Sequence, residues 1–147
     1  KSTRHRYACW GYNFDWQNRV TFVPRGEPNI ICTTFAGNAL LDAYEKHHNE
    51  EHLAIALSAS EFLLHGLNIT KSGDEICFSY TSRDYERVHN ANLLGAAFLT
   101  RLYRHTRDER LLAYALSAAK FSINRQAPDG SWPYGEGPSQ GWIDNFH

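Results

Sequence analysis

The segment TFAGNALLDAYEKHHNEEHLAIALSASEF, residues 34–62, decides the fold, because it returns as NLLGAAFLTRLYRHTRDERLLAYALSAAKF, residues 92–121. The two segments align at one constant offset, which places Gly37 on Gly95, and one inserted residue then places Ala54 on Ala113. Self-similarity at a fixed period is typical of proteins built from one supersecondary unit. The sequence therefore predicts that a single structural unit occurs twice.

Within each copy, apolar residues recur at intervals of three and four, which is the pattern of an amphipathic helix. A short polar stretch divides each copy into two helices, and Asp108 is suited to cap the second helix of the second copy. Two helical hairpins are thus expected at about 34–65 and 91–125, with long loops at 7–33, 66–90 and 126–147. The fold class predicted for this single domain, residues 1–147, is all-α.

The long loops share a pattern of their own. Each carries an aromatic residue followed two positions later by a tyrosine, in CWGY (9–12), CFSY (77–80) and SWPY (131–134). Because successive helices alternate in direction, these loops are expected to meet at one end of the helices. The first two loops lead into a helix, so we expect the third to do the same and the chain to be a fragment.

Paired helices with long aromatic loops at this period resemble the α/α toroids, which include six-hairpin glycosidases, sugar epimerases, polysaccharide lyases and terpenoid cyclases. The segment KFSINRQAPDGSW (120–132) is similar to the QW-type motif of the cyclases. VHNANLLGAA, DGSWPYGEG and GWIDNFH more closely resemble uncharacterised microbial toroid proteins associated with polysaccharide biosynthesis. The resemblance spans nearly the whole chain. It implies helical hairpins that form part of an α/α toroid, with the remainder of the toroid, a further chain segment or another subunit, as a partner.

Aromatic and amide side chains of the loops are the predicted binding residues. Aromatic faces suit the apolar C–H surfaces of sugars, although large aromatics also fill cores. All four tryptophans fall in the loops, where a purely structural protein would place most of them on helix faces. A carbohydrate ligand is therefore expected at Trp10, Tyr12, Asn90, Trp132, Tyr134, Trp142, Asn145 and His147.

Ionisable side chains near the loop ends are the predicted catalytic residues, namely His89, Tyr80, Asp144 and Glu136. Histidine and tyrosine can act as base and acid, and an asparagine can stabilise the enolate formed by proton abstraction beside a uronate carboxyl. A second interpretation makes Glu136 and Asp144 the carboxylate pair of a glycoside hydrolase. Helix capping alone would also explain His89-Asn90 and Asp144-Asn145.

Composition excludes several classes of function. Lys and Arg number 15 against 16 Asp and Glu, so no basic field recruits nucleic acid. The apolar runs are far shorter than the roughly twenty residues of a membrane span, so no membrane insertion is expected. Three cysteines without CxxC spacing favour a reducing, cytoplasmic compartment. His47, His48 and His52 lack a complete ligand set, so no metal is predicted, and GEGPSQG lacks the Lys-Ser/Thr pair of a phosphate loop, so no cofactor is predicted.

Together these features favour a carbohydrate-active protein that acts on a polysaccharide or a sugar-linked intermediate, by lyase- or epimerase-like proton abstraction. The first alternative is a non-catalytic carbohydrate-binding or scaffold module. The second is a terpenoid or prenyl-chain enzyme, against which stands the lack of an acidic DxDD or DDxxD cluster in the sequence.

Overall fold

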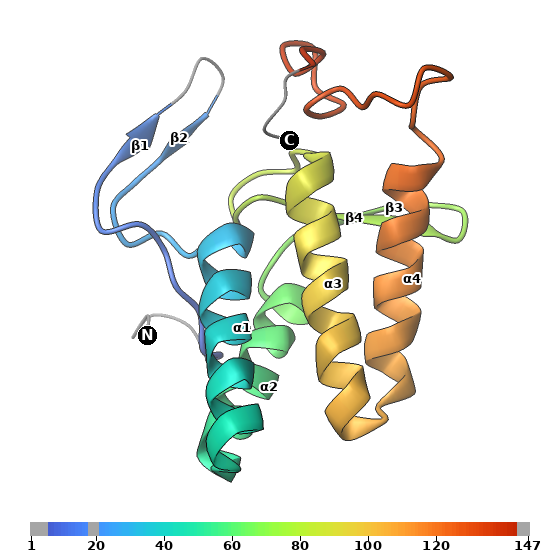
Figure 1. Cartoon of the computed structure of the whole chain (residues 1–147). Helices are drawn as coiled ribbons and strands as arrows, with labels where there is room; N and C mark the ends of the chain where they lie inside the picture. The colour runs from blue at the N-terminus through green and yellow to red at the C-terminus, as the bar shows by residue number, and fades with distance from the viewer. Residues whose placement is uncertain (1–5, 18–20, 144–147) are drawn as a thin grey trace.

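The structure is a computed structural model that describes residues 6–17 and 21–143. Its described residues form four helices, α1 (Ile30–His47), α2 (Glu50–His65), α3 (His89–Thr106) and α4 (Glu109–Ile123). They also form two small antiparallel sheets, which pair β1 (Trp16–Gln17) with β2 (Phe22–Val23), and β3 (Ile69–Ser72) with β4 (Glu75–Phe78). Figure 1 shows the four helices side by side, with one sheet beyond the start of α1 and the other beside α4.

The prediction of an all-α fold is wrong, because strands form inside two segments that were expected to be loops. β3 and β4 pair from Ile69 opposite Phe78 to Ser72 opposite Glu75, which leaves Gly73 and Asp74 as a two-residue turn. Gly73 has a φ of +61°, a conformation that glycine adopts without steric cost and that tight hairpin turns require. The fold is therefore mixed α/β.

The α/α toroid and the repeated hairpin architecture are also wrong, since the described residues form only this small mixed structure. Positions that match in the sequence repeat have different packing roles. A Cβ added to Gly37 would lie 2.5 Å from the ring of Phe98, whereas one added to Gly95 would lie 3.0 Å from Ile30. The repeat therefore reflects a shared helical pattern and not equivalent places in an array.

Three of the four helices begin at a polar capping residue. Asn29 accepts a hydrogen bond from the backbone N–H of Cys32 at 2.8 Å, and Asn49 and Asp108 cap α2 and α4 in the same way. The cap predicted at Asp108 is thus confirmed. α3 differs, because Val88 precedes it and no side chain caps it. His89 and Asn90 lie inside its first turn, so capping does not explain them.

Both short turns between helices begin with a residue in the left-handed region. His48 and Arg107 have φ angles of 52° and 57°, and their backbone N–H groups donate to the carbonyls of Tyr44 and Tyr103. This conformation is uncommon for residues other than glycine. It closes α1 and α3 at the end of the helices opposite the long loops.

The core lies where α2, α3 and α4 meet β4, and its largest fully buried side chains include Phe62, Phe78, Phe98 and Phe121. Asn92 is a buried polar residue at its centre. Its Oδ1 accepts from the N–H of Phe78 at 3.1 Å, and its Nδ2 donates to the carbonyl of Ala118 at 2.7 Å. One amide thus joins β4, α3 and α4, and satisfies polar groups that burial would otherwise leave costly.

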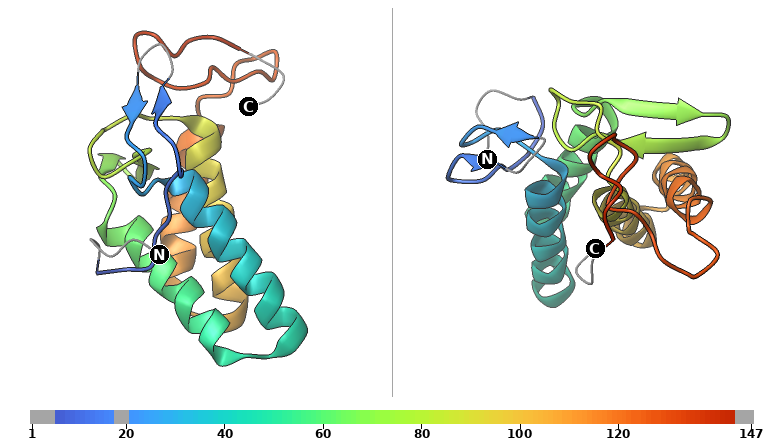
Figure 2. Two further views of the ribbon diagram at one scale, coloured as in Figure 1. Left: turned by 90° about the vertical axis from the view of Figure 1, so that its left-hand side faces the viewer. Right: turned by 90° about the horizontal axis from the view of Figure 1, so that it is seen from above.

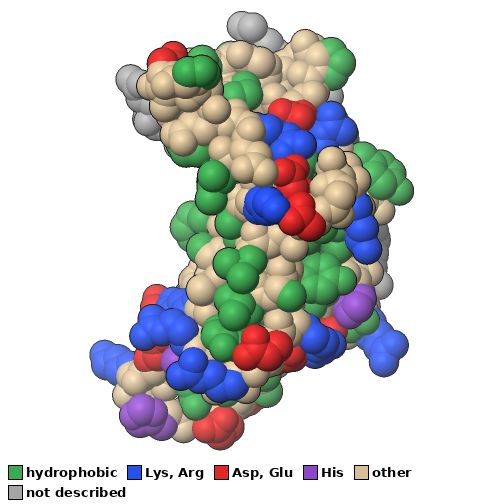
Figure 3. All heavy atoms as spheres, turned by 90° about the vertical axis from the view of Figure 1, so that its right-hand side faces the viewer, with side chains coloured by type: hydrophobic (Ala, Val, Ile, Leu, Met, Phe, Trp, Pro, Cys, Tyr) green, Lys and Arg blue, Asp and Glu red, His purple; other side chains and the backbone are tan. Residues whose placement is uncertain are grey.

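The long connections gather at one end of the helices, where α1 and α3 begin. We call this the loop end, and it comprises residues 9–17, 21–29, 79–88 and 126–143. Figures 1 and 2 show the β1–β2 hairpin above α1, and the last segment of the chain above α3 and α4. Below it, α4 leaves Leu116 exposed, and Figure 3 shows apolar side chains on this side of the molecule. Among the described helices, none is both long and apolar enough to cross a membrane.

Candidate functional site

An aromatic cluster of Tyr12, Phe14, Trp16 and Tyr80 occupies the loop end beside the start of α1. The hydroxyl groups of Tyr12 and Tyr80 lie 3.0 Å apart. Trp16 stacks on the ring of Tyr80, with centroids 5.8 Å apart, and Phe14 stacks on Tyr12 at 5.4 Å. Tyr80 is only 6% exposed, whereas Phe14 is 53% exposed, so the cluster runs from the core out to the surface.

Burial controls the ionisation of both hydroxyls. It raises the pKa of Tyr80 well above the usual 10, and its hydrogen bond to Tyr12 raises that pKa further. Burial also raises the pKa of Tyr12, although the hydrogen bond to Tyr80 opposes this shift. Both side chains are therefore protonated at neutral pH, when they can donate hydrogen bonds but cannot act as bases.

A cavity of about 270 Å³ lies next to this cluster, at the base of the β1–β2 hairpin. We name it the Trp10 cavity, and its lining residues are Cys9, Trp10, Gly11, Tyr12, Asn13, Arg25 and Gly26. The hydrogen bonds from the N–H of Gly26 to the carbonyl of Tyr12, 2.7 Å, and from the N–H of Trp10 to Thr33, 3.1 Å, hold its walls together. Two predicted binding residues, Trp10 and Tyr12, thus line one hollow.

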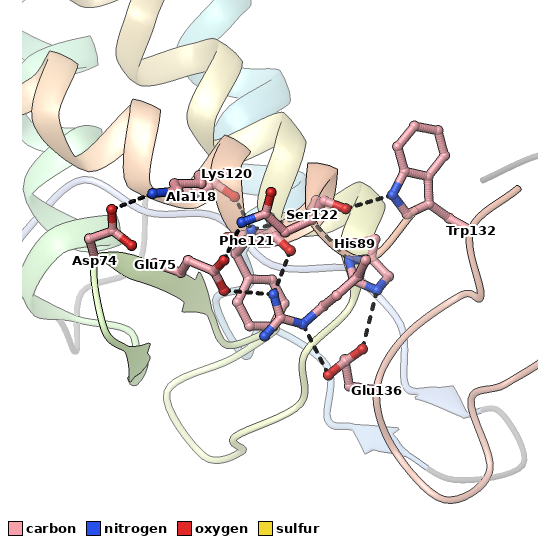
Figure 4. A network of polar contacts seen from close by, with 12 residues as sticks. Asp74, Glu75, His89, Ala118, Lys120, Phe121, Ser122, Trp132 and Glu136 are labelled. Atoms are coloured by element: carbon pink, nitrogen blue, oxygen red, sulfur yellow. Dashed lines mark hydrogen bonds and ion pairs between the residues drawn. The ribbon is translucent and has the colours of Figure 1, made fainter. Parts of the chain in front are cut away.

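A second group of predicted residues surrounds His89. Its Nδ1 lies 3.2 Å from the hydroxyl of Ser122, and its Nε2 lies 3.8 Å from the carboxylate of Glu136, without a hydrogen-bond partner among the described residues. Figure 4 shows Glu136 reaching toward His89 from the last segment of the chain. The side chain of His89 is 4% exposed, so a ligand cannot reach it unless surrounding groups such as Glu136 move.

Glu136 is held by an ion-pair network. Its second oxygen lies 3.2 Å from Arg125, whose guanidinium also pairs with Glu75 at 2.7 Å and lies 3.6 Å from the centre of the Phe121 ring. Burial lowers the pKa of His89, an effect that Glu136 opposes and Arg125 reinforces. The imidazole is therefore neutral at pH 7.

Glu136 also lines a separate cavity of about 390 Å³. The other lining residues are Tyr85, Glu86, Arg87 and residues 137–140.

The remaining predicted residues of the last segment, Tyr134, Trp142 and Trp132, make two separate sets of contacts. Tyr134 stacks on Trp142 with centroids 4.5 Å apart, and its carbonyl accepts a hydrogen bond from the N–H of His89. Trp132 donates from its indole N–H to the carbonyl of Ser122 at 2.6 Å, and Figure 4 shows it directed away from Glu136. Trp132 therefore fastens the last segment to the end of α4 and lies apart from the Trp10 cavity.

Of the other predicted site residues, the structure describes Asn90 but not those at positions 144–147. The side-chain oxygen of Asn90 is buried without a hydrogen-bond partner among the described residues. Asp144, Asn145 and His147 lie outside the described residues, so the carboxylate pair of Glu136 and Asp144 stays a prediction. Within the part of the chain that the structure describes, no three His, Cys, Asp or Glu residues gather as a metal site would require.

Sequence reasoning missed Asn13, Phe14, Trp16 and Arg25 as residues of this region. Trp16 was recognised only as a loop tryptophan, and its place beside Tyr80 depends on a two-residue strand pairing too short to leave a pattern. Arg25 follows a proline and precedes Gly26, whose φ is +77°, which signals a turn but not a cavity wall.

No protein-family model matches this chain, and no curated protein matches its sequence.

Proposed function

We propose that this chain binds a carbohydrate in the Trp10 cavity. The observation that supports the proposal is that Trp10 and Tyr12, two residues from the predicted binding set, line one hollow together with the polar groups of Asn13 and Arg25. Aromatic rings combined with a few polar groups are the usual lining of small-ligand sites. Sugars present both apolar C–H faces and hydroxyl groups, which such a lining accommodates.

The size of the cavity favours a small unit of ligand. Its volume of about 270 Å³ is below the roughly 300–1,000 Å³ of pockets that enclose drug-sized ligands. A cavity of this size can hold one sugar unit of a longer oligosaccharide. The exposed ring of Phe14, next to Tyr12, offers a further surface on which a neighbouring unit can lie.

The geometry supports binding better than proton abstraction. Of the predicted catalytic residues, Tyr80 is buried and protonated, and His89 is enclosed behind Glu136. Neither has the exposure that a general base needs to reach a substrate proton. The function best supported is therefore the non-catalytic binding module, and lyase- or epimerase-like catalysis remains the alternative.

The proposal includes a cytoplasmic location, which the cysteines support. Among the described residues, Cys32 and Cys77 take part in no disulfide, and Cys77 is buried. Burial raises the pKa of the Cys77 thiol to about 12, so this thiol resists oxidation. Free cysteines are typical of reducing compartments.

A binding titration followed by tryptophan fluorescence tests the proposal, with a panel of neutral and acidic oligosaccharides and with farnesyl diphosphate. We expect oligosaccharides to bind, and Tyr12→Ala to weaken binding at least tenfold. The matched control is Leu116→Ala, at an exposed apolar residue of α4, which should leave affinity unchanged.

Three results would contradict the proposal. Equal affinity in the Tyr12 variant would move the ligand away from the Trp10 cavity. Binding of farnesyl diphosphate alone would favour the prenyl-chain alternative. Release of an unsaturated uronate product, detected by its ultraviolet absorbance, would show that the protein is an enzyme and not a binding module.

A further inference from the structure

The charge of the Trp10 cavity comes from one residue. Of its lining residues, all of which the structure describes, Arg25 alone carries a charged side chain. The others are aromatic, amide, thiol or glycine. A ligand in this cavity therefore meets a single positive charge and no carboxylate in the lining.

The Arg25 side chain is available for a ligand. Across the described residues, no hydrogen bond or ion pair engages its guanidinium. Arg83, Arg101 and Arg125 differ, since each is paired with at least one carboxylate at 3.2 Å or less. The guanidinium of Arg25 thus has no ion-pair partner among the described residues, and the nearby Asp15 carboxylate contacts its backbone N–H instead.

The backbone that carries Arg25 is nevertheless fixed. Its N–H donates to the Asp15 carboxylate at 2.7 Å. The next residue, Gly26, donates to the carbonyl of Tyr12 at 2.7 Å, and the N–H of Glu27 donates to the carbonyl of Pro24 at 3.0 Å. The turn therefore places the base of the Arg25 side chain beside Tyr12, so little ordering of the backbone is needed when a ligand binds.

From this arrangement we infer that the Trp10 cavity takes an acidic carbohydrate, whose sugar carries a carboxylate that pairs with Arg25. The inference rests on the proposed carbohydrate binding and adds the chemical class of the ligand. Guanidinium presents parallel N–H donors that match the two oxygens of a carboxylate. The sugar ring then lies against Trp10 or Tyr12 while its carboxylate meets Arg25.

The test compares uronate oligosaccharides with their carboxyl-reduced, neutral counterparts, using trisaccharides of galacturonate, glucuronate and mannuronate. Calorimetry measures each affinity for the unaltered chain, for Arg25→Gln and for Arg104→Gln. Arg104 is an exposed arginine in the last turn of α3, far from the loop end, and serves as the matched control. Arg25→Gln keeps the backbone hydrogen bond to Asp15, so the turn should remain intact.

We expect at least one uronate trisaccharide to bind tenfold or more tightly than its neutral counterpart, with an affinity that falls as salt rises. Arg25→Gln should abolish this preference and Arg104→Gln should keep it. If neutral and acidic forms bind equally, or the preference survives in Arg25→Gln, the inference is overturned while carbohydrate binding stands. If no trisaccharide binds, both proposals fail.

Discussion

The hydroxyl groups of Tyr12 and Tyr80 meet at 3.0 Å although 68 residues separate them in the chain. This contact fixes the first long connection against the second, directly beside the Trp10 cavity. Because the ring of Trp16 stacks on Tyr80 and also lies 6.1 Å from the ring of Tyr12, the pair is held by rings as well as by the hydrogen bond. The loop end is therefore an ordered surface, on which several consequences can be measured.

The first prediction concerns this tyrosine pair. Tyr80→Phe removes one hydroxyl and leaves that of Tyr12 without its partner, which should lower the free energy of unfolding by about 1 kcal/mol. Urea denaturation measures the loss, and Tyr85→Phe, at a ring that is 70% exposed, is the control. A change of equal size in both variants would contradict the role assigned to the pair.

The same pair predicts a loss of stability at high pH. The folded-state pKa of both tyrosines is raised, so the unfolded chain releases their protons first as the pH rises past about 10. Stability should therefore fall above that pH, and fall less steeply in Tyr80→Phe. Urea midpoints measured between pH 9 and pH 11 check both slopes, and parallel slopes would refute the assignment.

His89 predicts a second dependence, at acidic pH. Burial lowers its folded-state pKa below the usual 6.5, so the unfolded chain takes up this proton first and stability falls as the pH drops below about 6.5. His89→Gln should remove that part of the pH profile. His47→Gln, at an exposed residue near the end of α1, should leave the profile unchanged, and a profile that persists in His89→Gln would disprove the assignment.

Asn92 should be among the residues most sensitive to truncation. Asn92→Ala removes the partner of the buried N–H of Phe78 and the additional donor to the carbonyl of Ala118, at a cost of about 3 kcal/mol in the free energy of unfolding. Asn124→Ala, at an exposed amide beside Glu75, should cost less than about 1 kcal/mol. Similar values for the two variants would show that the amide at the core centre is dispensable.

Gly37 should resist replacement even by alanine. The added methyl would lie 2.5 Å from the Phe98 ring, and such overpacking costs about 1–3 kcal/mol. Gly141→Ala is the control, because nothing lies within 4 Å of a Cβ added there. A double-mutant cycle with Phe98→Leu should recover part of the loss, and strict additivity would contradict the proposed contact.

The helices could be predicted from the sequence because their signals are local. Apolar spacing and the Asp108 cap are properties of neighbouring residues, and the structure has helices in both segments where that spacing occurs. The β3–β4 hairpin was missed even though its signal was present. Gly73 and Asp74 stand between ITKS and EICF, two short runs that contain β-branched or aromatic residues, but the helical repeat predicts a loop over the whole stretch.

The site could be predicted only in part, because it depends on contacts between distant segments. Tyr12 and Tyr80 were both identified from the repeated aromatic pattern, yet nothing in that pattern fixes a contact between their hydroxyls. The contact between His89 and Glu136, at 3.8 Å, forms because the fold brings the last segment back to the start of α3. Arg25 was missed because an arginine after a proline carries no motif, and only the folded turn places it on a cavity wall.

The short turns at His48, between α1 and α2, and at Arg107, between α3 and α4, have a practical consequence. Two unlike side chains, neither of them glycine, adopt the same left-handed backbone there, so the helix packing and not the freedom of glycine sets the shape of each turn. Both turns lie at the opposite end of the molecule from the Trp10 cavity. The protein could therefore be labelled with a dye or tethered to a surface at either turn for binding measurements, without obstructing the cavity.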